Sequence, residues 1–170
     1  MGIITLIGYM GCGKSTVSQE LAKSLDFEAL DLDDYIVGQE DRSISEIFKE
    51  KGEIYFRKKE SFYLEKILKE KDNLVLALGG GTPCYGHNMR LILDHSKSIY
   101  LRGSIPTLVG RLENEQDKRP LIASLDKENL TEFVAKHLFE RRNFYEQAHF
   151  TIAIDQKSTG DIVKEISLLI

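Results

Sequence analysis

The sequence predicts a three-layer α/β/α fold, in which helices cover both faces of a five-stranded parallel sheet. Five short apolar runs alternate along the 170 residues with stretches of helical periodicity. Strands that are apolar throughout are typical of parallel sheets, because the connecting helices bury both faces. The expected strands are Ile3–Ile7, Glu28–Leu32, Leu74–Leu78, Ser98–Leu101 and Phe150–Ile154.

The first expected strand runs into the pattern of a phosphate-binding loop, GYMGCGKS at residues 8–15, and a helical pattern follows directly. Such a loop folds its backbone N–H groups around a polyphosphate at the positive end of a helix. The alternative, a glycine-rich turn that carries Lys and Ser by coincidence, is disfavoured by the complete pattern and its flanks. We therefore expect nucleoside triphosphate binding, with Lys14 reaching the β- and γ-phosphates and Ser15 binding Mg²⁺. The candidate nucleotide-binding residues are Gly11, Cys12, Gly13, Lys14, Ser15 and Thr16.

Composition limits the other classes of function. The formal net charge of −4 disfavours general binding to nucleic acids or anionic membranes, which requires a basic surface. No apolar run approaches the length of a membrane span, and no signal-peptide pattern precedes the first strand. Cys12 lies inside the phosphate-binding loop, where a disulfide would hamper nucleotide entry, so we expect it and Cys84 to be free thiols in a cytoplasmic protein. We also expect one domain, and a monomer by default.

Two segments depart from simple strand–helix alternation. About forty residues between the second and third strands show helical periodicity, and we expect a helical insertion at about 33–61 beside the carboxyl edge of the sheet, where open α/β folds bind ligands. The polar stretch 114–120 predicts a surface loop. It is a candidate lid (about 113–125), although an ordinary solvated connection explains its composition at least as well.

A cluster of aspartates supplies the carboxylates that a metal–nucleotide site requires. In many proteins with a phosphate-binding loop, the third strand ends in an aspartate that helps to hold the metal. Here the third strand runs into glycines instead, so the candidates are Asp31, Asp33 and Asp34 at the end of the second strand. Strand alternation would point Asp31 and Asp33 the same way, one supporting Mg²⁺ and the other accepting a hydrogen bond from the attacking hydroxyl. We expect Asp34 to cap the following helix.

Glycines and arginines suggest a second ligand. Gly79, Gly80 and Gly81 follow a buried strand, where three glycines cost conformational entropy, so a close approach to a ligand explains them better than a sharp turn does. Arg57 and Arg141 lie on or beside apolar helix faces, where they bind either structural carboxylates or an anionic ligand; Arg142 could face solvent instead. Arg119, in the polar stretch, could reach the transferring phosphates.

Together these segments resemble the shikimate kinases, small relatives of the nucleoside monophosphate kinases. The matching stretches occur in order and are Gly8–Ser15, Asp31-x-Asp33, Gly52-Glu-x-x-Phe-Arg57, the glycine triplet 79–81, Arg119-Pro-Leu and Arg141-x-x-x-Tyr145. The resemblance implies a P-loop kinase fold with strand order 2-3-1-4-5, a substrate-binding helical insertion and a lid. It also implies transfer of the γ-phosphoryl group of ATP to the 3-hydroxyl of shikimate, in aromatic amino-acid biosynthesis.

The resemblance also implies roles for individual residues. Lys14 binds the ATP phosphates, Ser15 and Asp31 serve the metal, Asp33 binds substrate hydroxyls and accepts the attacking proton, and Arg119 acts on the phosphates from the lid. Arg57, the glycine triplet and Arg141 bind shikimate, while Arg111 and the loop 155–158 lie near adenine. This chain has Asn143-Phe144 where the family usually has Pro-Leu, which leaves the choice between Arg141 and Arg142 open.

The same motifs are compatible with two alternative functions. One is another small-molecule kinase, for gluconate or a nucleoside monophosphate, although paired arginines and a glycine-rich wall suit a small carboxylated polyol better. The other is a regulatory nucleotide-binding protein, which the absence of the guanine-reading Asn-Lys-x-Asp pattern disfavours in its GTPase form.

Overall fold

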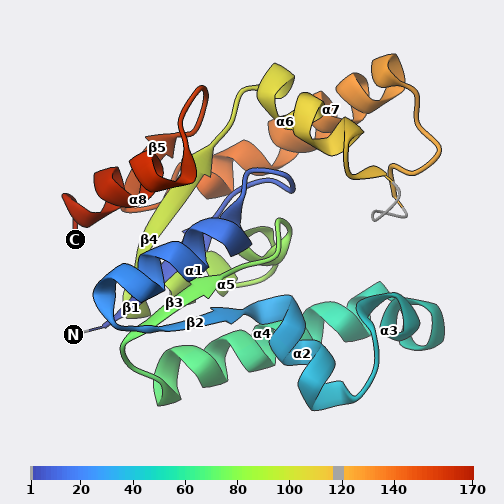
Figure 1. The fold of residues 1–170 in the computed structure, drawn as a ribbon. Coiled ribbons are helices and arrows are strands. Elements are labelled where there is room, and N and C mark those ends of the chain that lie inside the picture. Colours follow the sequence, from blue (N-terminus) through green and yellow to red (C-terminus); the bar gives the residue numbers. More distant parts are fainter. Residues whose placement is uncertain (1, 117–120) are drawn as a thin grey trace.

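A computed structural model describes residues 2–116 and 121–170, and its centre is a parallel sheet of order β2-β3-β1-β4-β5 (Figure 1). Its strands are β1 (Ile3–Ile7), β2 (Glu28–Asp31), β3 (Leu74–Ala77), β4 (Ser96–Arg102) and β5 (Phe150–Ala153). The predicted strands and their order are thus confirmed. The helices are α1 (Lys14–Leu25), α2 (Leu32–Glu40), α3 (Ile44–Lys51), α4 (Glu53–Glu70), α5 (Asn88–His95), α6 (Ile105–Glu113), α7 (Lys127–Tyr145) and α8 (Thr159–Ser167), with a 3₁₀ turn, η1 (Thr82–Cys84).

The central strands are buried because helices lie on both sides of the sheet. All five residues of β1 and all four of β3 are buried, as their continuous apolar sequences predict. Helices α1 and α8 pack together in front of the sheet in Figure 1, and α5 lies behind it. Cys12 and Cys84 are free thiols. None of the helices in the described part of the chain combines the length and apolar character needed to span a bilayer.

The boundaries of β2, β3, β4 and β5 differ from the expectation by one or two residues. Strand β4 begins at Ser96 rather than Ser98, because Ile3 of β1 is already in register with Ser96. Strand β2 ends at Asp31 because the Asp31 side chain accepts a hydrogen bond from the Asp33 backbone N–H and starts helix α2 at Leu32. The expectation that Asp34 caps this helix is therefore wrong, since Asp31 does.

Helices α2, α3 and α4 fill the segment between β2 and β3 and lie along the bottom of Figure 1, and α4 continues to Glu70, beyond the expected insertion at about 33–61. The phosphate-binding loop follows the carboxyl end of β1, at the edge of the sheet where these helices lie. Helices α6 and α7 lie above the loop in Figure 1. The topology thus brings the motif-bearing segments to one edge of the sheet. Of the candidate lid, residues 117–120 lie outside the described residues.

Candidate active site

The phosphate-binding loop has the backbone geometry that its glycines predict. Gly11 and Gly13 have φ angles of 81° and 91°, in the region that side chains disfavour. The Lys14 ammonium donates hydrogen bonds to the carbonyl oxygens of Gly8 at 2.8 Å and Tyr9 at 3.0 Å. A cavity of about 590 Å³ opens at the loop and is lined by Lys14, Ser15, Asp31, Asp33 and other residues. It is large enough for a small-molecule ligand.

Ser15 and Asp31 lie side by side at the N-terminus of helix α1. The Ser15 hydroxyl donates a hydrogen bond to Asp31 Oδ2 at 2.8 Å. Across the described residues, no group of three or more His, Cys, Asp or Glu side chains could hold a metal by itself. The Ser15 hydroxyl and the Asp31 carboxylate are hard oxygen donors, the kind of ligand that Mg²⁺ prefers.

Asp33 lies in the first turn of α2, and its environment favours the neutral acid. Burial raises the pKa of Asp33 from its ordinary 3.8 to about 6; the negative charges of Asp31 and Glu60 add to the shift, and Lys14 and Arg57 oppose it. Asp33 is helical, so strand alternation is the wrong reason for placing it beside Asp31, yet both side chains line the cavity. A carboxylate with a pKa near 6 is ionised at neutral pH and suits general-base chemistry.

The glycine triplet after β3 touches three of the predicted substrate-binding residues. A β-carbon at Gly79 would lie 3.3 Å from Asp33 Oδ1, and one at Gly80 would lie 3.3 Å from Arg141 Nη1. At Gly81 the β-carbon would lie 2.5 Å from Arg57 Nη2, which is too close for any real contact. The space of each missing side chain is thus bordered by a different polar side chain. The triplet brings the three groups together although they come from separate helices.

Arg57 is held on helix α4 by a carboxylate that the sequence patterns did not reveal. Its guanidinium is 2.8 Å from Glu60 Oε2, and the other oxygen of Glu60 accepts a 2.6 Å hydrogen bond from the Thr82 hydroxyl. The Glu60 side chain is only 1% exposed. A buried carboxylate with two partners fixes the direction of Arg57 toward the triplet. The signal was visible as a charged residue within the apolar stripe of Phe56, Tyr63 and Leu64.

On α7, the structure separates the two adjacent arginines. Arg141 lies beside Gly80, with its guanidinium carbon 5.7 Å from the centre of the Tyr9 ring. Arg142 is 63% exposed and forms an ion pair with Glu146 on the surface. The Tyr145 hydroxyl donates a 2.6 Å hydrogen bond to the Gly80 carbonyl, which ties α7 to the triplet. Arg141 is therefore the arginine that faces the site.

The remaining predicted residues are placed as follows. Arg111 donates a hydrogen bond to the Gly11 carbonyl at 3.3 Å and lines the cavity with Lys157 of the 155–158 loop. Arg119, predicted to act from the lid, lies outside the described residues. Gly79 and Gly80 line the cavity directly, whereas Gly81 and the two arginines do not. Arg141 lies next to Gly80, and Arg57 lies next to Gly81.

Comparison with known proteins decides the family. A family model described as shikimate kinase matches residues 10–170. The chain belongs to the shikimate kinase family. A shikimate kinase of Flavobacterium johnsoniae is 46% identical over 164 residues, covering 96% of this chain and 95% of the relative. That of Flavobacterium psychrophilum is 47% identical with the same coverage.

Solved structures of the family confirm the predicted fold. The crystal structure of the shikimate kinase from Bacteroides thetaiotaomicron matches with a TM-score of 0.92 and 31% identity, covering 99% of this chain and 97% of that one. The shikimate kinase from Acinetobacter baumannii, solved in complex with shikimate, matches with a TM-score of 0.90 and 31% identity, covering 99% and 92%. The three-layer arrangement on a five-stranded parallel sheet is thus that of the shikimate kinases.

Proposed function

We propose that this chain is an ATP-dependent shikimate kinase, which transfers the γ-phosphoryl group of ATP to the 3-hydroxyl of shikimate and releases shikimate 3-phosphate and ADP. The observation that carries the proposal is the glycine triplet. It begins at the wall of the cavity that the phosphate-binding loop lines, and it is bordered by Asp33, Arg57 and Arg141. Two arginines and one carboxylate at a narrow, side-chain-free wall match a small acceptor that carries both a carboxylate and hydroxyl groups.

The phosphates of ATP bind in the phosphate-binding loop. Backbone N–H groups at the N-terminus of α1 bind the phosphates, from Gly11, Gly13, Ser15 and Thr16, and from Cys12 once its N–H leaves the Tyr9 carbonyl. The Lys14 ammonium leaves its carbonyl partners to bind the β- and γ-phosphate oxygens. Its charge is then available where negative charge gathers during transfer.

Arg57 and Arg141 hold the carboxylate of shikimate. Each guanidinium can donate two parallel hydrogen bonds to a carboxylate, which fixes orientation as well as affinity. With the carboxylate held, the 3-hydroxyl lies toward Asp33. The reaction forms a bond between this oxygen and the γ-phosphorus and breaks the bond to the ADP oxygen, while Asp33 receives the hydroxyl proton.

Mg²⁺ is the metal that these residues fit. Ser15 would hold it directly, and Asp31 would hold it directly or through water. When bound, Mg²⁺ would neutralise part of the negative charge of the triphosphate during transfer. Asp31 thus serves the metal and the start of α2 at the same time.

The other features of the proposal come from the family resemblance and the sequence. We propose that Arg119 contacts the phosphates when the lid at about 113–125 closes, and that the 170 residues act as one kinase domain with a substrate-binding insertion at about 33–61. We further propose a cytoplasmic monomer in aromatic amino-acid biosynthesis with no nucleic-acid partner. Size-exclusion chromatography with light scattering tests the monomer.

An assay of ADP release with shikimate, gluconate and nucleoside monophosphates as separate acceptors tests the function. We expect ADP release that depends on shikimate and on Mg²⁺. Turnover with gluconate or a nucleotide instead would assign another kinase activity. ADP release without an acceptor would favour a regulatory nucleotide-binding protein.

A further inference from the structure

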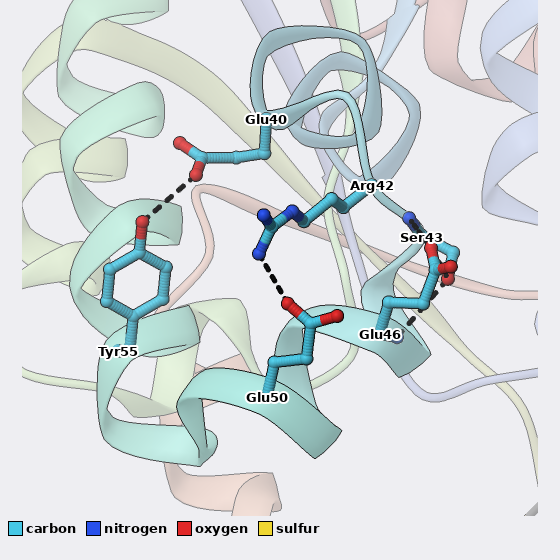
Figure 2. A network of polar contacts seen from close by, with 6 residues as sticks. All are labelled: Glu40, Arg42, Ser43, Glu46, Glu50 and Tyr55. Carbon is cyan, nitrogen blue, oxygen red and sulfur yellow. Dashed lines mark hydrogen bonds and ion pairs between the residues drawn. The ribbon is translucent and has the colours of Figure 1, made fainter.

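A polar cluster whose residues do not line the cavity joins α2 and α4, the helices of the insertion that carry Asp33 and Arg57. Glu40, the last residue of α2, accepts hydrogen bonds from the Tyr63 hydroxyl at 2.6 Å and the Tyr55 hydroxyl at 3.0 Å. The Lys59 ammonium lies 3.0 Å from the same carboxylate. Figure 2 shows Glu40 and Tyr55 pointing toward each other from their two helices. The Glu40 side chain is only 13% exposed, so these contacts are partly shielded from water.

The three partners of Glu40 form one stripe of helix α4. Tyr55, Lys59 and Tyr63 are four residues apart, so they lie above one another on the same face. The Lys59 ammonium also lies 5.6 Å from the centre of the Tyr55 ring and 5.8 Å from that of Tyr63. The hydrogen bond from Tyr63, with those from Lys59 and Tyr55, lowers the pKa of Glu40, so the carboxylate stays ionised at neutral pH. A single carboxylate therefore binds two turns of α4.

This stripe lies opposite Arg57. An α-helix turns by about 100° per residue, which places Arg57 about 200° from Tyr55 around the axis of α4. Contacts on the Tyr55 face thus set the rotation of the helix and the direction of the opposite face. Glu40 also ends the helix whose first turn presents Asp33, about 10 Å away at 1.5 Å per residue.

We infer that Glu40 is a positioning residue for the acceptor: by binding Tyr55, Lys59 and Tyr63 it sets the rotation and spacing of α4 relative to α2, and so places Arg57 against Asp33. The inference rests on the proposed function, because it assigns Arg57 and Asp33 to acceptor binding. None of the contacts of Glu40 described above involves the phosphate-binding loop. Its loss should therefore act on shikimate and leave ATP largely unaffected.

Steady-state kinetics of two Glu40 variants test the inference. Glu40→Ala removes all three contacts, and we expect it to raise the KM for shikimate and to lower kcat/KM for shikimate about 10- to 100-fold, because small displacements of positioning groups have effects of this size. The KM for ATP should stay close to the wild-type value. Glu40→Gln keeps an oxygen acceptor for the tyrosine hydroxyls, so it should recover most of the shikimate affinity. Should Glu40→Ala fold poorly, Tyr63→Phe removes only the shortest bond and should show a smaller selective loss for shikimate.

A neighbouring ion pair provides a matched control. Arg42 and Glu50 pair in the same corner of the insertion (Figure 2), and both are about half exposed. Glu50→Gln should leave both KM values near wild type. The inference is overturned if Glu40→Ala raises both KM values equally or neither, or if Glu40→Gln is as impaired as Glu40→Ala. A wild-type protein that does not phosphorylate shikimate would instead overturn the proposed function and this inference with it.

Discussion

Replacing Asp33 by asparagine should stabilise the fold while it removes activity. The pKa of Asp33 is raised from 3.8 to about 6 because its carboxylate is buried near Asp31 and Glu60. Folding therefore opposes the ionisation of Asp33. Below pH 4 the side chain is neutral in both the folded and the unfolded state and the effect is absent. It grows between pH 4 and 6 and is constant above, because Asp33 is then ionised in both states.

The size of the effect follows from the shift. A difference of about two pKa units corresponds to about 3 kcal/mol at 1.36 kcal/mol per unit. An asparagine side chain has nearly the same volume and no charge, so Asp33→Asn should recover this free energy at neutral pH. For a chain of this length, the gain corresponds to a rise in Tm of about 6–12 °C. Turnover should fall by about 10²- to 10⁴-fold, because no proton acceptor remains, while ATP binding stays near normal.

Urea unfolding of wild type and Asp33→Asn, at pH values from 4 to 8, measures the difference in free energy of unfolding. Asp34→Asn is the matched control, since Asp34 is exposed on the same turn of α2 and loses the same charge. We expect the two variants to differ at pH 7 and to converge near pH 4. If Asp33→Asn is no more stable than the control at pH 7, or if its gain is independent of pH, the reasoning about this site is refuted.

Three further variants test the glycine triplet and its partners. Arg141→Ala should weaken shikimate binding far more than ATP binding by calorimetry; an unchanged shikimate affinity would remove this arginine from the site. Gly81→Ala should displace the Arg57 guanidinium, raising the KM for shikimate, while circular dichroism shows the fold intact; a normal KM would mean that the crowding relaxes without cost. Tyr145→Phe should cost about 1–2 kcal/mol in urea unfolding, because the Gly80 carbonyl loses its partner, and equal stability would contradict that estimate.

Local patterns predicted the sheet and the phosphate-binding loop, because both depend on residues that are close together in the sequence. Continuous apolar runs marked the strands, and the pattern of residues 8–15 marked the nucleotide side. The start of α2 was mispredicted, because a hydrogen bond from the Asp33 backbone to Asp31 decides it and periodicity does not report such a bond.

Contacts that depend on how helices rotate and pack stayed hidden in the sequence. Glu60 binds Thr82 across 22 residues, and Glu40 binds Tyr63 across 23. Charged residues on a helix usually read as a solvated face, so neither glutamate was singled out. Arg141 was distinguished from Arg142 only when the structure placed one beside Gly80 and the other beside Glu146.

The crowding around the triplet bears on how inhibitors of this enzyme could lose their effect. A substitution that puts a larger side chain into the space of a bound compound would exclude that compound. At Gly79, Gly80 and Gly81 few such substitutions would be tolerated, because any β-carbon contacts a group that we assign to substrate binding. A mutant that blocked the drug there would also disturb shikimate. For a compound that binds against this backbone segment, few substitutions of the three glycines could therefore exclude the compound and still allow shikimate to bind.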